Sequence, residues 1–529
     1  MRLTNRSYLP VLFVAILLII PLWVVTRHLS FRLDTDYNVI LPMATFALRA
    51  YTHPFPYLSW NPNIGLGIPA LGDSSFMLSP FYMPLFFLFG PDNGLRVLIA
   101  VTIIGSGLSM WYFLSSFKLR PWAIAWGAIL YEFSGALAAM IAAGHVEKFA
   151  GYAIGPVVFL YFFRKRMKPV EAATVGIIYA CILLTADFYS LWFFSLFYVV
   201  SAAYRIITKN SKLKEIIQEI LYIYGFFVAF ALSKLLPFIR DVIPHINRLQ
   251  TIDPYAGSIH AWLLPLSFLI PWQVEFYDRP TLQRIIGFHY NWYEYYAFIT
   301  PFAVIPLLYI QKVWKSYPVR LAVIFVITAA CYISLRYPYS PFYWLFHNIT
   351  LVRMFRVPQR VVVPLMIPVV MVITFCADYM IVKGSNVVKR YLVLCLIGSV
   401  VWLFVMNFNT IKGTFEPFRS NESAIAHELR RRDGSNFFVA NFVCCMQPFL
   451  LRESIPILNY YYGWTPTYTP RFADPITGKN NFRELTVMRP SYIIADKNES
   501  FTQYGYELYF GGGNVEVWRT DTPTIIPSL

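Results

Sequence analysis

Charged residues are scarce in this sequence of 529 residues. They make up 14% of the chain, against about 25% in ordinary soluble domains. Hydrophobic residues make up 57%, and the mean hydropathy is +0.52. This composition excludes a soluble globular enzyme, a disordered chain and a fibrous repeat. It predicts a polytopic α-helical membrane protein.

Cysteines are also few and form no pattern. Four of the six lie in apolar runs, and the other two, Cys444 and Cys445, are adjacent, which is poor geometry for a mutual disulfide. The chain also lacks the motifs GxxxxGKS/T, GxGxxG with βαβ spacing, HExxH and GxSxG. We therefore expect no structural zinc, no obligatory disulfide, no ATP-driven pump and no soluble-type nucleotide-sugar enzyme.

Long apolar runs predict about eleven transmembrane helices, because a bilayer core of about 30 Å needs about 20 apolar residues per helix. The predicted spans are residues 9–26, 95–116, 122–143, 149–163, 170–186, 188–203, 216–233, 297–310, 321–335, 361–382 and 391–407. The run 76–90 is interpreted as a re-entrant or interfacial segment. A transmembrane domain over 1–407 is followed by a small extracytoplasmic α+β domain over 408–529, where charge runs, glycine turns and short strand-like runs appear.

The distribution of basic residues predicts the orientation. With a cytoplasmic N-terminus, the segments 1–8, 117–121, 164–169, 204–214, 311–320 and 383–390 lie in the cytoplasm. They hold 18 Lys and Arg in 48 residues, with no Asp or Glu. Positive loops mark the cytoplasmic side of a membrane protein. We therefore expect a multi-pass plasma-membrane protein with the loops 27–94 and 234–296 and the C-terminal domain outside; the second loop is interpreted as a lid over a groove.

The first external loop, 27–94, contains an aspartate pair directly after the first span. Asp34 and Asp36 precede apolar residues at helical spacing, which predicts an amphipathic helix along the membrane interface. Two interpretations stand: the aspartates cap this helix, or they remove a proton from an acceptor hydroxyl or bind a divalent cation such as Mg or Mn. Asp73, in the segment WNPNIGLGIPALGD, is a further carboxylate candidate.

Other polar residues lie at the predicted outer ends of spans. The segment GHVEK provides His145, Glu147 and Lys148, and Asp187 lies where two apolar runs meet. These residues are interpreted either as interfacial side chains that pair locally or as contacts to phosphate or sugar.

Three arginines, Arg353, Arg356 and Arg360, precede a span on the outer face. Arginine there is disfavoured unless it has an anionic partner, which is a donor phosphate or an anionic lipid headgroup. We predict a donor-phosphate site formed by these arginines with His145 and Lys148.

The segments DTDYN (34–38), WNPNIGLGIPALGD (60–73), GHVEKFAGYAIGP (144–156) and FRVPQR (355–360) resemble those of the GT-C superfamily of membrane glycosyltransferases. The resemblance extends to YfhO-like and related archaeal and bacterial multi-spanning proteins. It implies a polyprenyl-phosphate-linked sugar donor used at the outer face. It also implies that an acidic residue of the first external loop, Asp36 or Asp34, acts as base or helps to bind a metal.

The sequence therefore predicts a membrane glycosyltransferase of the cell envelope, whose acceptor is a glycan, lipid or protein. Membrane lipids are further partners, and nucleic acid is not expected. Two alternatives remain. One is a transporter or flippase of a lipid-linked glycan, although neither internal repeats nor mid-membrane charges are evident. The other is a non-catalytic GT-C-fold subunit that binds or assembles glycans.

Overall fold

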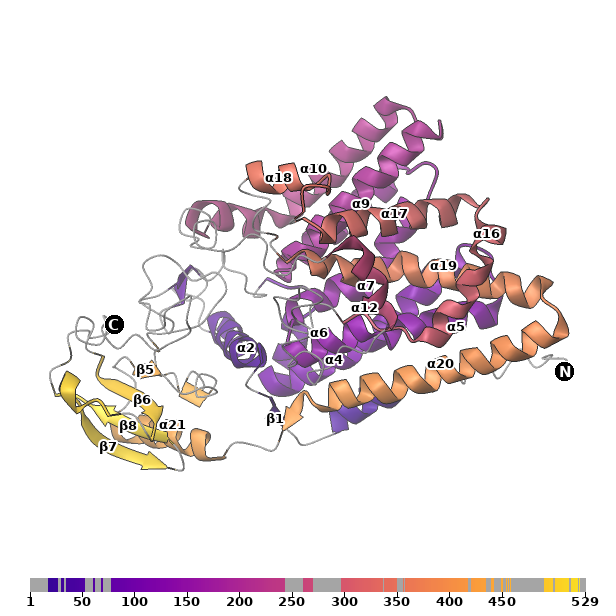
Figure 1. The fold of residues 1–529 in the computed structure, drawn as a ribbon. Helices are drawn as coiled ribbons and strands as arrows, with labels where there is room; N and C mark the ends of the chain where they lie inside the picture. The colour runs from indigo at the N-terminus through magenta and orange to yellow at the C-terminus, as the bar shows by residue number, and fades with distance from the viewer. Residues whose placement is uncertain are drawn as a thin grey trace.

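The computed structural model describes residues 18–26, 30–32, 35–52, 60–61, 68–69, 78–242, 260–269, 296–335, 337–349, 355, 357–416, 420–433, 439–441, 449–450, 453, 455, 457, 490–497, 500–512, 515–521 and 523. Most of this part of the chain is helical (Figure 1). Helices packed around an aromatic-rich core form one body. The small sheet of the C-terminal region lies at one end of this body (Figure 1).

Six helices in the described ranges are long and apolar enough to cross a membrane. They are α4 (Met83–Ser115), α5 with α6 (Pro121–Glu132 and Gly135–Ala143), α9 (Phe188–Ile207), α10 (Leu213–Pro237), α19 (Val362–Lys383) and α20 (Asn386–Lys412). Shorter apolar helices include α7 (Phe149–Phe162), α8 (Pro169–Leu184) and α17 (Tyr317–Ile333). The prediction of a polytopic helical membrane protein is confirmed, with six candidate spans where the sequence predicted about eleven.

One predicted span differs markedly from the observed helices. Residues 297–310 do not form one helix; the chain there passes through α15 (Pro301–Val304), the 3₁₀ turn η6 (Ile305–Tyr309) and α16 (Ile310–Val313). Pro301 and Pro306 begin two of these turns, because proline removes a backbone donor and favours a first helical position. Of the predicted span 9–26, only 18–26 is described, and it is helical.

The segment 76–90, predicted as re-entrant or interfacial, mostly joins the start of α4. This helix is broken at Gly90, which has φ +75° and ψ 173°, and Pro91 follows it. Glycine reaches this conformation without strain, and proline then restarts the helix. A short apolar helix therefore precedes the long membrane-crossing part of α4.

The predicted span 122–143 is divided between α5 and α6 at residues 133–134. Groups from other segments satisfy the backbone at this break: the Asn407 side chain donates to the Phe133 carbonyl, and Gly135 N donates to Phe298 O at 2.8 Å. Such partners are needed because an unsatisfied backbone group within a bilayer is costly. Glu132, just before the break, is buried, and its carboxylate oxygens have no hydrogen-bond partner among the described residues.

The C-terminal region contains the expected small α+β structure. After α20, β4 (Phe415–Glu416) pairs antiparallel with β1 (Ser30–Phe31). Helix α21 (Ser420–Asp433) precedes a four-stranded sheet of order β5-β6-β8-β7, with β5 (Val439–Asn441) parallel to β6 (Tyr492–Asp496), and β7 (Glu507–Gly512) and β8 (Val515–Arg519) antiparallel. The Arg432 guanidinium lies over the rings of Tyr509 and Phe510, which joins α21 to β7.

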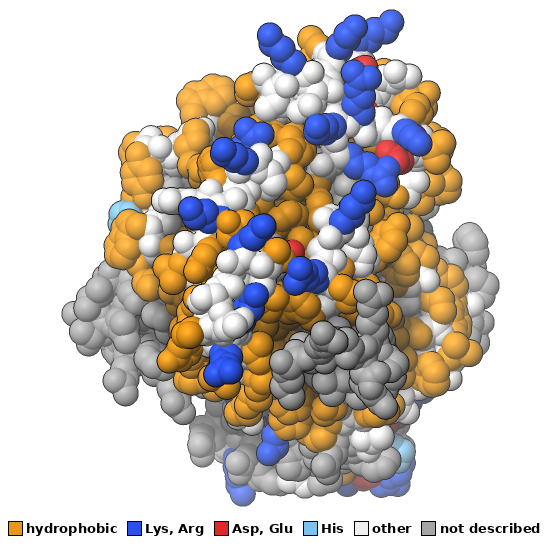
Figure 2. Space-filling view, turned by 90° about the vertical axis from the view of Figure 1, so that its right-hand side faces the viewer, with side chains coloured by type: hydrophobic (Ala, Val, Ile, Leu, Met, Phe, Trp, Pro, Cys, Tyr) orange, Lys and Arg blue, Asp and Glu red, His pale blue; other side chains and the backbone are white. Residues whose placement is uncertain are grey.

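One face of the helical body is strongly basic. Figure 2 views the end at which α16 and the turn between α19 and α20 lie, and Lys and Arg side chains are spread over it with few Asp or Glu. This asymmetry agrees with the charge pattern of the loops predicted to be cytoplasmic. The side of the membrane that this face occupies stays a prediction.

Candidate functional site

Asp36 lies in the turn that leads into α2 (Tyr37–Thr52), the helix predicted along the interface. Its backbone N–H donates to Ala143 O at 3.0 Å, and its carbonyl accepts from Ile40 N at 3.0 Å. The turn is therefore held at one end by α2 and at the other by the end of α6. The Asp36 side chain is 50% exposed, so its carboxylate is open to another molecule.

The GHVEK segment packs directly against this turn. Gly144 ends α6 with φ +80°, a left-handed conformation that glycine adopts at helix ends. A Cβ at this position would lie 2.8 Å from Tyr37 N and 3.1 Å from the Asp36 carbonyl carbon. Position 144 therefore requires glycine for two reasons: the left-handed backbone angle and the close approach of the chain at the start of α2.

Two buried tyrosines form hydrogen bonds to the backbone on either side of the GHVEK segment and within it. Tyr37 Oη donates to Ile141 O at 2.7 Å. Tyr82 Oη donates to Val146 O at 2.7 Å and accepts from Ala150 N at 3.1 Å. Both tyrosines are buried. They satisfy backbone groups that the helix ends leave open, and they fix the direction in which residues 145–148 point.

His145 and Lys148 form a buried chain that ends at Asp36. His145 Nε2 lies 3.3 Å from Asp36 Oδ2, and Lys148 Nζ lies 2.7 Å from His145 Nδ1. The side chains are nearly inaccessible, since His145 is 4% and Lys148 2% exposed. The 3₁₀ turn η1 (Val146–Lys148) produces this contact, because residues three apart lie on the same side of such a turn.

This chain of contacts assigns the tautomer of His145. A lysine ammonium only donates hydrogen bonds, so Nδ1 must accept. The ring proton then lies on Nε2, from which it is donated to the Asp36 carboxylate. A buried positive charge is thereby linked through a neutral imidazole to an ionised, half-exposed carboxylate.

The electrostatics agree with an ionised Asp36. Burial raises the pKa of this carboxyl, but the hydrogen bond that His145 donates and the positive charges of Arg360 and Lys148 outweigh it. The net effect lowers the pKa below its ordinary value. Asp36 is therefore charged at neutral pH and available as a proton acceptor.

Of the three predicted arginines, Arg360 lies in the described residues and acts on this site. It belongs to η8 (Pro358–Val361), at the start of α19. Its guanidinium lies 4.3 Å from the ring centre of Tyr189, a cation–π contact that orients the side chain. Arg353 and Arg356 lie outside the described residues.

The other predicted carboxylates occupy different positions. Asp187 is buried, and its Oδ1 accepts from Ser190 N at 2.9 Å, which caps α9. Burial raises the pKa of Asp187 to about 7, against the opposing effects of Ser190 and Lys148. Glu147 is half-buried, and its carbonyl accepts from Thr185 Oγ1 at 3.3 Å. Asp187 therefore caps α9 from a buried position, in the electrostatic range of Lys148.

The predicted metal site receives no support from the described ranges, where no group of three or more His, Cys, Asp or Glu side chains could hold an ion. His145 Nε2 also carries a proton in the assigned tautomer, so it has no lone pair for a metal beside Asp36. Asp34 and Asp73 lie outside the described residues. A divalent cation thus stays a prediction that depends on those residues.

The sequence predicted Asp36 as the base and His145, Lys148 and Arg360 as donor-phosphate ligands. In the structure His145 lies against Asp36 and the buried Lys148 lies against His145, while Arg360 acts on Asp36 through its charge. Nothing in the sequence indicated the roles of Tyr37, Tyr82 and Tyr189. Aromatic residues form 18% of the chain, so no composition signal distinguishes these three from the others.

No family model and no curated protein match this chain, but solved structures do. ArnT from Cupriavidus metallidurans bound to undecaprenyl phosphate matches over 97% of this chain and 98% of its own, with 12% identity and a TM-score of 0.53. The arabinofuranosyltransferase AftD from Mycobacteria matches over 98% of this chain and 42% of its own, with 10% identity and a TM-score of 0.54. At these identities the similarity shows the fold. The chain therefore shares the fold of ArnT and AftD, a GT-C-like fold.

Proposed function

We propose that this protein transfers a sugar from a polyprenyl-phosphate-linked donor to a hydroxyl-bearing acceptor, with Asp36 as the base. The observation that carries the proposal is the ionised, half-exposed Asp36 carboxylate backed by the buried His145–Lys148 pair. The fold supports it, because ArnT, which shares this fold, was solved with undecaprenyl phosphate. The motifs that resemble the YfhO-like branch support an assignment to that branch.

The proposed reaction is a displacement at the anomeric carbon of the donor. Asp36 accepts the acceptor's O–H proton, and the acceptor oxygen forms a bond to the anomeric carbon. The bond between that carbon and the phosphate oxygen breaks, and polyprenyl phosphate leaves with the electron pair. Arg360 balances the charge that grows on the phosphate, a form of electrostatic stabilisation that commonly supplies much of the rate.

His145 and Lys148 support Asp36 in this proposal. The Nε2–H of His145 fixes the direction of one carboxylate oxygen, so the other oxygen faces the acceptor. Lys148 keeps His145 in the tautomer that can donate. The orientation follows the charge asymmetry: the basic face in Figure 2 is cytoplasmic, and Asp36, with the C-terminal region, is extracytoplasmic.

The test compares Asp36→Asn with Asp36→Ala in purified protein that is given a radiolabelled polyprenyl-phosphate sugar and an acceptor extract. Asparagine keeps the shape and the helix-capping ability of aspartate but cannot accept the proton. Transfer by Asp36→Asn should fall at least about 10²-fold, with thermal stability near that of the wild type. Asp378→Asn is the matched control: Asp378 accepts from Arg120 N at 3.3 Å, on helix α19 and away from this site.

Each outcome distinguishes one interpretation. Full transfer by Asp36→Asn would contradict the role of Asp36 as base. If Asp36 only caps α2, Asp36→Asn should keep full activity and stability, and Asp36→Ala should be mildly destabilised. Donor binding without transfer in the wild type, under every acceptor tested, would favour the non-catalytic glycan-binding subunit. Movement of the donor across sealed vesicles without transfer would favour the flippase.

A further inference from the structure

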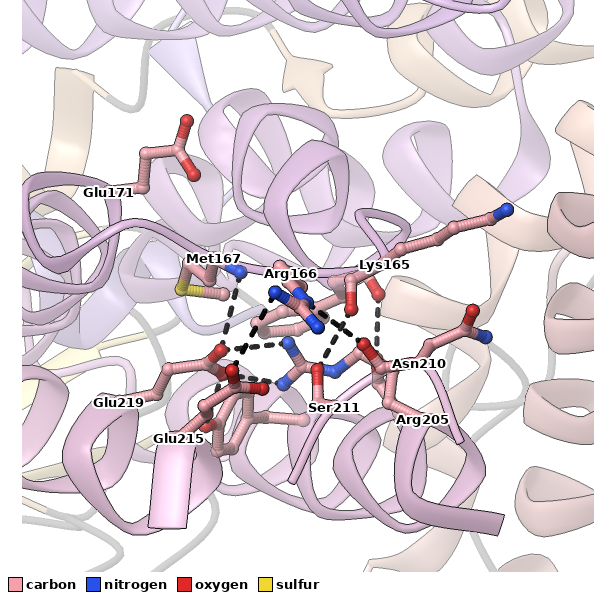
Figure 3. Close-up of polar contacts among 12 residues, drawn as sticks. Lys165, Arg166, Met167, Glu171, Arg205, Asn210, Ser211, Glu215 and Glu219 are labelled. Atoms are coloured by element: carbon pink, nitrogen blue, oxygen red, sulfur yellow. Dashed lines mark hydrogen bonds and ion pairs between the residues drawn. The ribbon is translucent and has the colours of Figure 1, made fainter. Parts of the chain in front are cut away.

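A second polar cluster lies far from Asp36 in the chain, where two basic loops meet (Figure 3). One loop, 164–168, joins α7 to α8, and the other, 208–212, joins α9 to α10. Ser211 Oγ donates to Lys165 O at 2.9 Å, and Arg166 Nε donates to Asn210 O at 3.2 Å. Two loops about 40 residues apart in the sequence thus form one surface.

A buried ion pair holds the two loops in place. Arg205 donates to both carboxylate oxygens of Glu219, at 3.0 and 2.6 Å. Glu219 also accepts from Tyr198 Oη at 3.1 Å and from Met167 N at 3.3 Å. Both partners are buried, and a bidentate arginine–carboxylate pair has a defined geometry. The pair therefore connects helices α9 and α10 to the first loop.

The acidic residues near the two loops each lie beside an arginine. Glu219 pairs with Arg205, Glu171 pairs with Arg164, and Glu215 lies 3.7 Å from Arg166. Each carboxylate thus neutralises one arginine and leaves the lysines uncompensated.

Five exposed lysines remain on the two loops and their edges. None of the five forms an ion pair with a carboxylate in the part of the chain that the structure describes; they are Lys165, Lys168, Lys209, Lys212 and Lys214. We call them the lysine platform. In Figure 3 the Lys165 side chain extends away from the buried pair, which is where an external anion would approach.

Exposed apolar side chains border the platform. Val170 and Ile207 are 76% and 77% exposed, and Leu213 is also exposed. Cationic side chains beside exposed aliphatic ones match the boundary of a bilayer, where lysine ammonium groups reach the headgroups and apolar side chains contact acyl chains. A soluble acidic protein would match the charges and leave the aliphatic side chains uncovered.

We propose that the lysine platform binds the phosphate groups of anionic phospholipids in the membrane leaflet on the basic face. This site is separate from Asp36 and does not depend on the proposed glycosyltransferase activity. Its function is to anchor and orient the α7–α8 and α9–α10 loops against the headgroups. Each engaged lysine should add to the affinity, so the loss of all five should weaken anionic-lipid binding at least about tenfold.

The experiment titrates the purified full-length protein in neutral detergent with phosphatidylglycerol or phosphatidylcholine, and native mass spectrometry counts the bound lipid. The platform variant is K165Q/K168Q/K209Q/K212Q/K214Q. The matched control is K118Q/K312Q/K315Q/K383Q/K389Q, which removes five lysines from the other loops predicted to lie on the same side. Both variants lose the same charge, and thermal unfolding checks that both are folded.

We expect phosphatidylglycerol to bind the platform variant at least about tenfold more weakly, while the control keeps near wild-type affinity. Phosphatidylcholine should bind all three proteins alike. Equal losses in both variants would overturn the proposal, because net charge alone would then explain binding. Unchanged binding by the platform variant would overturn it too and favour a soluble acidic partner. Displacement of the lipid by an equal concentration of glycerol phosphate would also overturn the proposal, because a free phosphate ligand would then bind without the apolar border.

Discussion

Replacing Lys148 by methionine tests the buried support of Asp36. Methionine keeps a long unbranched side chain but removes the ammonium that donates to His145 Nδ1 at 2.7 Å. His145 can then carry its proton on Nδ1 and present the lone pair of Nε2 to the Asp36 carboxylate. The hydrogen bond between Nε2 and Oδ2 is lost in that tautomer.

The size of the effect follows from this contact. Hydrogen bonds to charged groups contribute about 1.5–3 kcal/mol, but the distance here is 3.3 Å and the carboxylate is half exposed. Solvent screening therefore reduces the effect to about 1 kcal/mol, or about fivefold in rate. The sign depends on pH. His145, Arg360 and Lys148 lower the pKa of Asp36 in the wild type, so in Lys148→Met this pKa rises and the ionised fraction falls on the acid side.

The assay is kcat/KM for sugar transfer as a function of pH. In Lys148→Met the acid limb should move to higher pH, and the rate should recover as pH rises. Lys148→Arg should retain part of the effect, and Lys315→Met, on the basic face, should leave the profile unchanged. An equal loss at every pH would indicate a purely structural role, and a rise in donor KM alone would restore the prediction of Lys148 as a phosphate ligand. The ¹⁵N NMR signals of His145, identified with His145→Gln, report the tautomer without reference to activity.

Two further predictions concern stability. Glu219→Gln leaves the Arg205 charge buried without its partner, so the free energy of unfolding should fall by about 3–5 kcal/mol. In thermal or denaturant unfolding, R205M/E219L should recover most of this lost stability. A similar loss of stability in both variants would contradict the argument. Burial raises the pKa of Asp187 from 3.8 to about 7, so the unfolded chain releases this proton at lower pH and wild-type stability should fall as pH rises from about 4 to 7. Asp187→Asn, which still caps α9, should match the wild type near pH 4 and have a higher melting temperature at pH 8; parallel curves would refute this assignment.

The sequence predicted the membrane class because apolar length and loop charge are summed over many residues. It also predicted the α+β character of the C-terminal region from turn and charge signals. It could not predict the break between α5 and α6, because the residues that permit it, Asn407 and Phe298, lie far away in the chain. The division of 297–310 into short turns shows a similar limit: hydropathy measures burial in lipid and is insensitive to where a proline interrupts a helix.

The candidate site was predictable in its polar residues but not in their roles. Asp36 and His145 stand out because polar side chains are rare at the ends of apolar runs. Their contact joins residues 109 apart and depends on how α2 packs on the end of α6. Whether His145 and Lys148 face a ligand or face Asp36 is decided by the turn at Gly144 and by the Tyr82 hydrogen bonds. A linear sequence contains no direct measure of either.

The position of this site along the helices also separates the proposed enzyme from a transporter. Transporters bind their cargo near the middle of the membrane, between two halves that rock. Here the polar groups of the candidate site lie at helix ends: Asp36 precedes α2, His145 follows α6, and Arg360 lies in the turn that leads into α19. Glu132 is the described carboxylate nearer the middle of a span, and it is buried. Chemistry on a lipid-linked donor needs its reacting groups where the headgroup lies, and the helix ends provide that position.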